Sequence, residues 1–231
     1  MAQDCLRLGS IGRPGGIALV AALVLVSSQC RAPSGPPWAP LNLNWGVTKI
    51  PKGSAPSIDG VLSLGEWSDA AQVGILVEPT WEVKVLLKHD AENLYLAFQG
   101  VEHGGRRLYP EVMIDPELRR GERWSAGQLW LHVSQNLCEG SGEFNVYERN
   151  GAFQCAHTKS GWEANNPPDG ADAIEVRVSL KKMGLATPNE RIIGLALDVT
   201  DATGDAKQLF RYWPECAEIA QPTTWGLALL E

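Results

Sequence analysis

Basic residues are scarce in this chain of 231 residues. Lys and Arg number 20 against 27 Asp and Glu, which gives a net charge of −7, and no run of basic residues occurs. Such a chain lacks the cations that neutralise phosphates, so we expect no nucleic-acid partner. Tyr and Phe are also few, with 4 of each, whereas Trp numbers 9. Trp offers the largest flat apolar surface among the side chains, and it suits either a core or a platform for a planar ligand.

Long hydrophobic runs are missing except for one near the N-terminus, residues 17–26. It follows a segment that carries Arg7 and Arg13 and precedes Ser27-Ser-Gln-Cys30, the order of a secretory signal peptide. About ten apolar residues are too few to span a bilayer. We therefore expect residues 1–30 to be a signal peptide and the protein to be exported, as a secreted, periplasmic or cell-surface protein. Cys30 is a candidate lipidation site, so the only membrane contact expected is through a lipid anchor.

Cysteine is sparse as well, and the five present show no CxxC or Cys/His spacing typical of zinc sites. Export removes Cys5, which leaves the later cysteines in an oxidising compartment. Cys138 and Cys155 flank a strand-like segment, so a hairpin would bring them together as a disulfide. Cys216 is then expected to be a buried free thiol.

Catalytic signatures are likewise missing. No Ser or Cys stands in a recognised nucleophile context, and there are only 4 His. Glu111 with Asp115, or Asp115 with Glu117, forms a carboxylate pair that could formally serve hydrolysis, but nothing distinguishes them from surface acids. We expect a non-catalytic protein.

The sequence has many short strand signals. A proline-rich spacer, residues 31–45, leads into a region whose apolar residues mostly alternate and which contains many turn formers. No helical stripe exceeds about two turns. The expected strands are 83–88, 94–98, 111–114, 129–133, 174–178, 193–197 and 227–230. This pattern predicts one all-β domain over residues 46–231, an antiparallel β-sandwich of jelly-roll or immunoglobulin-like type.

Six motifs in order carry a family resemblance. Pro56-Ser-Ile-Asp-Gly60 and Gly65-Glu-Trp67 resemble the opening of family 9 carbohydrate-binding modules and their DOMON-like relatives. The later motifs are Asp90-Ala-Glu-Asn-Leu-Tyr95, Pro110-Glu-Val-Met-Ile-Asp115, Ala173-Ile-Glu-Val-Arg-Val178, Leu195-Ala-Leu-Asp-Val-Thr-Asp201 and Trp225-Gly-Leu-Ala-Leu-Leu230. The resemblance spans residues 46 to 231. It implies a β-sandwich that binds an oligo- or polysaccharide and serves a partner glycoside hydrolase in polysaccharide breakdown.

Strand alternation places a candidate site. Glu111, Met113 and Asp115 share one strand face, opposite Val112 and Ile114. On the neighbouring expected strand, Trp130 and His132 share the face opposite the apolar residues. An aromatic plate beside a carboxylate and an imidazole suits a sugar, which offers C–H faces and hydroxyl groups. The resemblance implies that Glu111 contacts the ligand. The complete candidate ligand-binding set is Glu111, Trp130, His132, Tyr109, Met113, Trp124 and Trp162.

The sequence departs from the family at two platform positions. The family has one Trp just before the strand that contains Glu111 and another in the last loop, where this chain has residues 104–109 and 218–221 without Trp. Arg106 and Arg107 replace an acidic pair. They are candidates for reading an acidic sugar, or else a solvated basic turn.

Three alternatives stay open. Asp198, Asp201 and Asp205 surround a Gly turn, so they are candidate calcium ligands or an exposed acidic turn. Met113 and His132 are a candidate haem ligand pair, as in DOMON-like electron-transfer domains, although Met113 more simply fills a gap in the core. A third alternative is a surface scaffold with a degenerate pocket.

Overall fold

The computed structural model describes residues 46–125, 127–134, 137–140, 146–148, 154–157, 161–165, 173–185, 190–201 and 210–231. The expected signal peptide, the spacer and the candidate lipidation site Cys30 lie outside these residues. Within the described ranges, no helix is long and apolar enough to cross a membrane.

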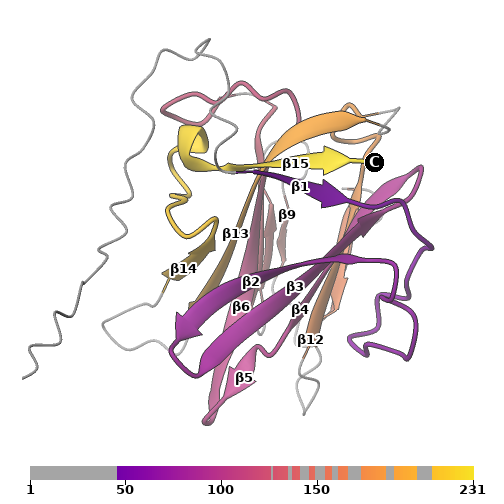
Figure 1. Cartoon of the computed structure of the whole chain (residues 1–231), viewed down its shortest axis with the longest axis vertical. Helices are drawn as coiled ribbons and strands as arrows, with labels where there is room; N and C mark the ends of the chain where they lie inside the picture. The colour runs from indigo at the N-terminus through magenta and orange to yellow at the C-terminus, as the bar shows by residue number, and fades with distance from the viewer. Residues whose placement is uncertain are drawn as a thin grey trace, which may run out of the picture. The chain divides into compact units, whose positions relative to one another are not determined.

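The described residues form two sheets (Figure 1). Sheet A has the order β1-β15-β13-β6-β7-β8-β9, and β14 and β5 pair with β13 and β6 respectively. Its strands are antiparallel except for β1 and β15, which run parallel. The bounds are β1 Val47–Ile50, β5 Glu102–His103, β6 Arg106–Asp115, β7 Leu129–Ser134, β8 Leu137–Gly140, β9 Val146–Glu148, β13 Arg191–Asp201, β14 Phe210–Trp213 and β15 Gly226–Leu230.

Sheet B has the order β10-β11-β12-β4-β3-β2 and is antiparallel throughout. Its strands are β2 Ala71–Glu78, β3 Trp81–His89, β4 Asn93–Gln99, β10 Gln154–His157, β11 Trp162–Asn165 and β12 Ala173–Ser179. A short 3₁₀ helix, η3 (Pro222–Thr224), precedes β15. The antiparallel sandwich that strand alternation predicts is thereby confirmed.

One core fills the space between the sheets. Val83, Val85 and Leu87 of β3 are fully buried, and they belong to the same apolar cluster as Val112 and Ile114 of β6. Alternation gives each strand one core-facing row, because successive side chains point to opposite faces. The other row of each sheet is left for a covering segment or for a site.

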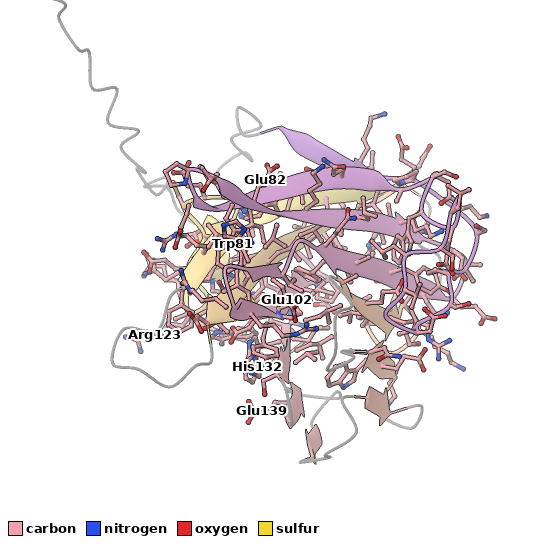
Figure 2. All side chains as sticks on the ribbon, turned by 90° about the horizontal axis from the view of Figure 1, so that it is seen from below. Trp81, Glu82, Glu102, Arg123, His132 and Glu139 are labelled. Carbon is pink, nitrogen blue, oxygen red and sulfur yellow. The ribbon has the colours of Figure 1, made fainter. Side chains whose placement is uncertain are left out.

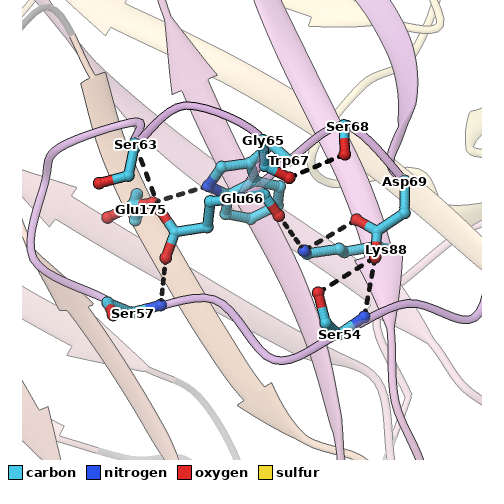
Figure 3. A network of polar contacts seen from close by, with 10 residues as sticks. All are labelled: Ser54, Ser57, Ser63, Gly65, Glu66, Trp67, Ser68, Asp69, Lys88 and Glu175. Carbon is cyan, nitrogen blue, oxygen red and sulfur yellow. Dashed lines mark hydrogen bonds and ion pairs between the residues drawn. The ribbon is translucent and has the colours of Figure 1, made fainter.

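The opening motif covers the outer face of sheet B (Figure 3). Its Trp67 packs with Tyr95 and Ala97 of β4. Glu175 of β12 is fully buried beneath the motif and accepts hydrogen bonds from three groups: the backbone N–H of Asp59 (3.0 Å), that of Gly60 (2.7 Å) and Trp67 Nε1 (2.9 Å). Burial raises the pKa of Glu175, and these hydrogen bonds oppose the rise. The motif is therefore a structural cover.

A buried lysine completes this cover. Lys88 of β3 is fully buried, and its Nζ donates to the Glu66 carbonyl at 2.5 Å and to Asp69 Oδ1 at 2.9 Å (Figure 3). The same Nζ lies 5.0 Å from the centre of the Trp67 ring, a cation–π contact. Sheet B is thus covered on both faces where the motif lies.

The expected strands all occur, with longer bounds. Strand β2 was not expected, although Val73, Ile75 and Val77 alternate within it and could have indicated it. The short strands β1, β5, β8, β10, β11 and β14 were also not expected. They are too short for period-2 alternation to stand out.

Candidate functional site

A row of polar side chains crosses the outer face of sheet A. Glu111 of β6 lies opposite Asp198 of β13 on one side and His132 of β7 on the other, and His132 lies opposite Glu139 of β8. Figure 2 shows His132 and Glu139 following one another along this edge of the molecule. Cross-strand neighbours of this kind are close enough to interact directly. The predicted shared face of Glu111 and His132 is present.

Trp130 is held by this row. Its Nε1 donates to Glu111 Oε2 at 2.9 Å, and its ring stacks on His132 with a centroid separation of 5.7 Å and an interplanar angle of 18°. The second Glu111 oxygen lies 3.0 Å from His132 Nδ1, an ion pair when the imidazole is protonated. Glu111 is only 6% exposed. Its carboxylate is thus positioned to orient the two rings.

Beside Trp130 lies an apolar cleft of about 290 Å³, lined by Trp124, Trp130, Ile219 and Ala220. Trp124 comes from the loop between β6 and β7, whereas Ile219 and Ala220 come from the segment between β14 and β15. Trp124 is 37% exposed and meets Trp225 edge to face, with ring centroids 5.1 Å apart. The cleft volume lies just below the range of about 300–1,000 Å³ that is typical of small-molecule sites.

A second acid, Asp198 of β13, lies beside Glu111 as its cross-strand neighbour. Asp198 is fully buried, and its Oδ1 accepts the backbone N–H of Arg211 at 2.9 Å, while Oδ2 has no hydrogen-bond partner among the described residues. Burial, followed by the charge of Glu111, raises the pKa of Asp198 to about 8. Tyr212 faces Asp198 from β14, and burial and Asp198 raise the pKa of Tyr212 to about 12. Asp198 is therefore a largely protonated acid at neutral pH.

Comparison with known proteins finds similar solved structures. No family model and no curated protein matches the chain. Two similar solved structures are of a family 9 carbohydrate-binding module from Caldicellulosiruptor kristjanssonii, both 17% identical to this chain. The complex with cellotriose has a TM-score of 0.53 and covers 80% of this chain and 93% of that one. The complex with glucose has a TM-score of 0.52 and covers 79% and 94%.

The fold is that of a family 9 carbohydrate-binding module. The resemblance predicted from the six motifs is confirmed at the level of the fold. In this chain the last loop, where the family has a platform Trp, contributes Ile219 and Ala220 to the cleft. Trp124, from a different loop, supplies an aromatic side chain to the same cleft. The family 9-like fold thus combines an aliphatic last loop with an aromatic residue placed elsewhere.

Two predicted ligand-binding residues, Trp162 and Tyr109, lie away from the cleft, and a third, Met113, is buried beneath it. Trp162 is buried in the core between the sheets and belongs to sheet B, so it does not neighbour Trp130. Trp162 is the first residue of β11, and its side chain points into the core. The sequence did not indicate this, because Trp162 follows a turn. Tyr109 is buried against the main core cluster. Met113 is fully buried with Ala196 and Trp225, and the cleft residues Trp130 and Ile219 pack against this cluster. The alternative role of Met113 as a haem ligand stays a prediction.

The three acids proposed as calcium ligands do not all meet in the described structure. Asp198 and Asp201 are three positions apart on β13, so their side chains point to opposite faces. Asp201 Oδ2 accepts from Arg106 Nε at 3.2 Å, and Asp205 lies outside the described residues. Within the ranges that the structure describes, no three His, Cys, Asp or Glu side chains cluster as metal ligands.

The arginines that replace the family's acidic pair are engaged with acids of the chain itself. Arg106 pairs with Glu78 at 2.6 Å as well as with Asp201, and its guanidinium carbon lies 5.3 Å from the centre of the Trp81 ring. Arg107 pairs with Glu102. These contacts favour a structural role over recognition of an acidic sugar.

The cysteines require one correction. Cys216 is disulfide-bonded, so the expectation of a free thiol is wrong. Cys216 is the only cysteine whose side chain is described, so its partner is one of the others. The side chains of Cys138 and Cys155 lie outside the described residues, and the bridge predicted between them stays a prediction.

Proposed function

We propose that this protein binds carbohydrate without catalysis, at the cleft between Trp124 and Trp130 on the outer face of sheet A. The observation that carries this proposal is the cleft itself, in which two tryptophan side chains border an apolar space and one of them, Trp130, is held in place by Glu111 and His132. Sugar rings present apolar C–H faces that stack on aromatic rings, so such a cleft suits a pyranose. The cellotriose and glucose complexes of the structural neighbours support the same ligand class.

The size and lining of the cleft favour a short stretch of glycan. Its volume is about 290 Å³, and its four lining residues, Trp124, Trp130, Ile219 and Ala220, are all apolar or aromatic. Binding would therefore depend on the face of the sugar ring more than on many hydrogen bonds. We further propose an exported protein, secreted or anchored by lipid at Cys30, that assists a glycoside hydrolase in polysaccharide breakdown.

A glycan array followed by titration calorimetry with cellotriose and glucose tests this proposal. Trp130→Ala is expected to weaken binding by about tenfold or more, because it removes the stacking surface. Phe210→Ala is the matched control: Phe210 is an aromatic residue of the same sheet, 38% exposed, and does not line the cleft. The affinity of Phe210→Ala for both sugars is expected to match that of the wild type. Failure of the wild type to bind any glycan, or unchanged binding by Trp130→Ala, would refute the proposal.

A further inference from the structure

The two segments that form the cleft are linked to each other and to β6. Asp115, the last residue of β6, is 1% exposed, and its Oδ2 accepts hydrogen bonds from the Arg120 backbone N–H at 2.9 Å and from Gln128 Nε2 at 2.8 Å. Gln128 Oε1 in turn accepts the backbone N–H of Ser125 at 2.8 Å, next to Trp124. One carboxylate oxygen therefore fastens both ends of the loop that carries Trp124.

Arg120 extends this link to the opposite wall. Its guanidinium Nη2 donates to the Thr223 carbonyl at 2.8 Å, and the Thr223 backbone N–H donates to the Gly121 carbonyl at 3.3 Å. Thr223 belongs to η3, directly after the segment that contributes Ile219 and Ala220. Burial lowers the pKa of the Arg120 guanidinium and the charge of Asp115 opposes this, as expected for a cation enclosed beside an acid.

The backbone at Arg120 is in an unusual conformation. Its φ is +44° and that of Leu118 is +52°, a region that side-chain-bearing residues rarely adopt. Such conformations persist only where surrounding contacts over-determine them, and they gather at ligand-binding loops. Here the contacts that hold the loop are those of Asp115 and Arg120.

We propose that Asp115 and Arg120 are positioning residues of the cleft, holding Trp124 against Trp225 and fixing the distance between the loop and the 219–220 wall. The consequence for glycan binding rests on the proposed function, whereas the placement of Trp124 does not. A preset cleft favours ligands that fit its width, because no ordering of the loop is then required on binding. Arg120 and Asp115 act through Trp124 and need not touch the sugar.

Arg120→Ala tests the proposal, with Arg119→Ala as the matched control. Arg119 is the neighbouring residue with the same charge, but its guanidinium pairs with exposed Glu117 on the same loop. The readout without ligand is the exciton band in circular dichroism that the edge-to-face Trp124–Trp225 pair should produce, assigned by its loss in Trp124→Phe. The readout with ligand is affinity for cellotriose and glucose.

We expect Arg120→Ala to lose most of the exciton band and to weaken cellotriose binding by about fivefold to tenfold, while Arg119→Ala retains both. Arg120→Lys, which keeps a cationic donor, is expected to restore part of each. If Arg120→Ala does not fold, Arg120→Met keeps the buried stem and removes only the guanidinium. The proposal would be overturned if Arg120→Ala kept the exciton band. It would also be overturned if the wild type binds glycan and Arg120→Ala binds it with the same affinity. If the wild type binds no glycan, the proposed function fails and the exciton band alone decides the role of Arg120.

Discussion

Replacement of Glu175 by Ala tests the interpretation that the opening motif is a structural cover. The side chain accepts three hydrogen bonds from fully or partly buried donors, two backbone N–H groups and Trp67 Nε1. A buried donor left without an acceptor costs about 1–3 kcal/mol, so three would cost about 3–9 kcal/mol. The carboxylate itself is disfavoured by burial, as its raised pKa indicates, and this offsets part of the loss. We therefore expect the free energy of unfolding to fall by about 3–5 kcal/mol.

Urea denaturation monitored by tryptophan fluorescence measures this change. Glu163→Ala is the matched control, because Glu163 lies on the adjacent strand β11 and makes a partly exposed ion pair with Arg177 at 2.7 Å. Ion pairs of that kind contribute about 0–1 kcal/mol. The loss of stability in Glu175→Gln should lie between those of Glu175→Ala and Glu163→Ala. The amide oxygen of Gln can still accept hydrogen bonds, whereas its NH₂ group would face other donors. A free energy of unfolding for Glu175→Ala within about 1 kcal/mol of the wild-type value would contradict this expectation.

Two further predictions concern groups on sheet A and its last loop. Because the pKa of Asp198 is raised to about 8, the folded protein holds this proton more tightly than the unfolded chain; its contribution to stability is full below about pH 4 and is lost as pH rises through about 8. In Asp198→Asn, the free energy of unfolding measured by urea denaturation should decrease less between about pH 5 and pH 9 than in the wild type. The same pH dependence in both proteins would argue against a raised pKa of Asp198. Peptide mapping without reduction should find Cys216 in a disulfide-linked peptide, whereas alkylation of Cys216 in the unreduced, unfolded chain would show the bond to be absent.

Much of the fold could be predicted from the sequence because period-2 alternation encodes which face of a strand is buried. The same rule placed Glu111, Trp130 and His132 on one outer face, where the structure has them. It did not locate Ile219 or Ala220, which reach the cleft from an irregular segment whose path no periodicity describes. Trp162 illustrates the opposite failure: in a four-residue strand, one turn residue more or less reverses the face that a side chain occupies.

The role of Glu111 could be predicted only in part. Its position on the outer face follows from alternation, but its burial and its hydrogen bond to Trp130 depend on side chains of a neighbouring strand. The ligand contact that the resemblance implies stays a prediction, whereas the hydrogen bond to Trp130 is a role that the sequence did not indicate. Trp124 was correctly grouped with Trp130, whereas its contact with Trp225 requires two loops to meet in space.

The parallel pairing of β1 with β15 has a consequence for the order of folding. Val47–Ile50 find their partners in Leu227–Leu230, and β15 also covers residues 191–195 of β13. During synthesis β1 therefore emerges long before its partner, and part of the β13 edge stays unpaired until the last strand is made. Such long-range pairing slows folding and leaves strand edges open to association with other chains. Nascent chains that stop short of residue 226 should consequently depend on chaperones to remain unaggregated.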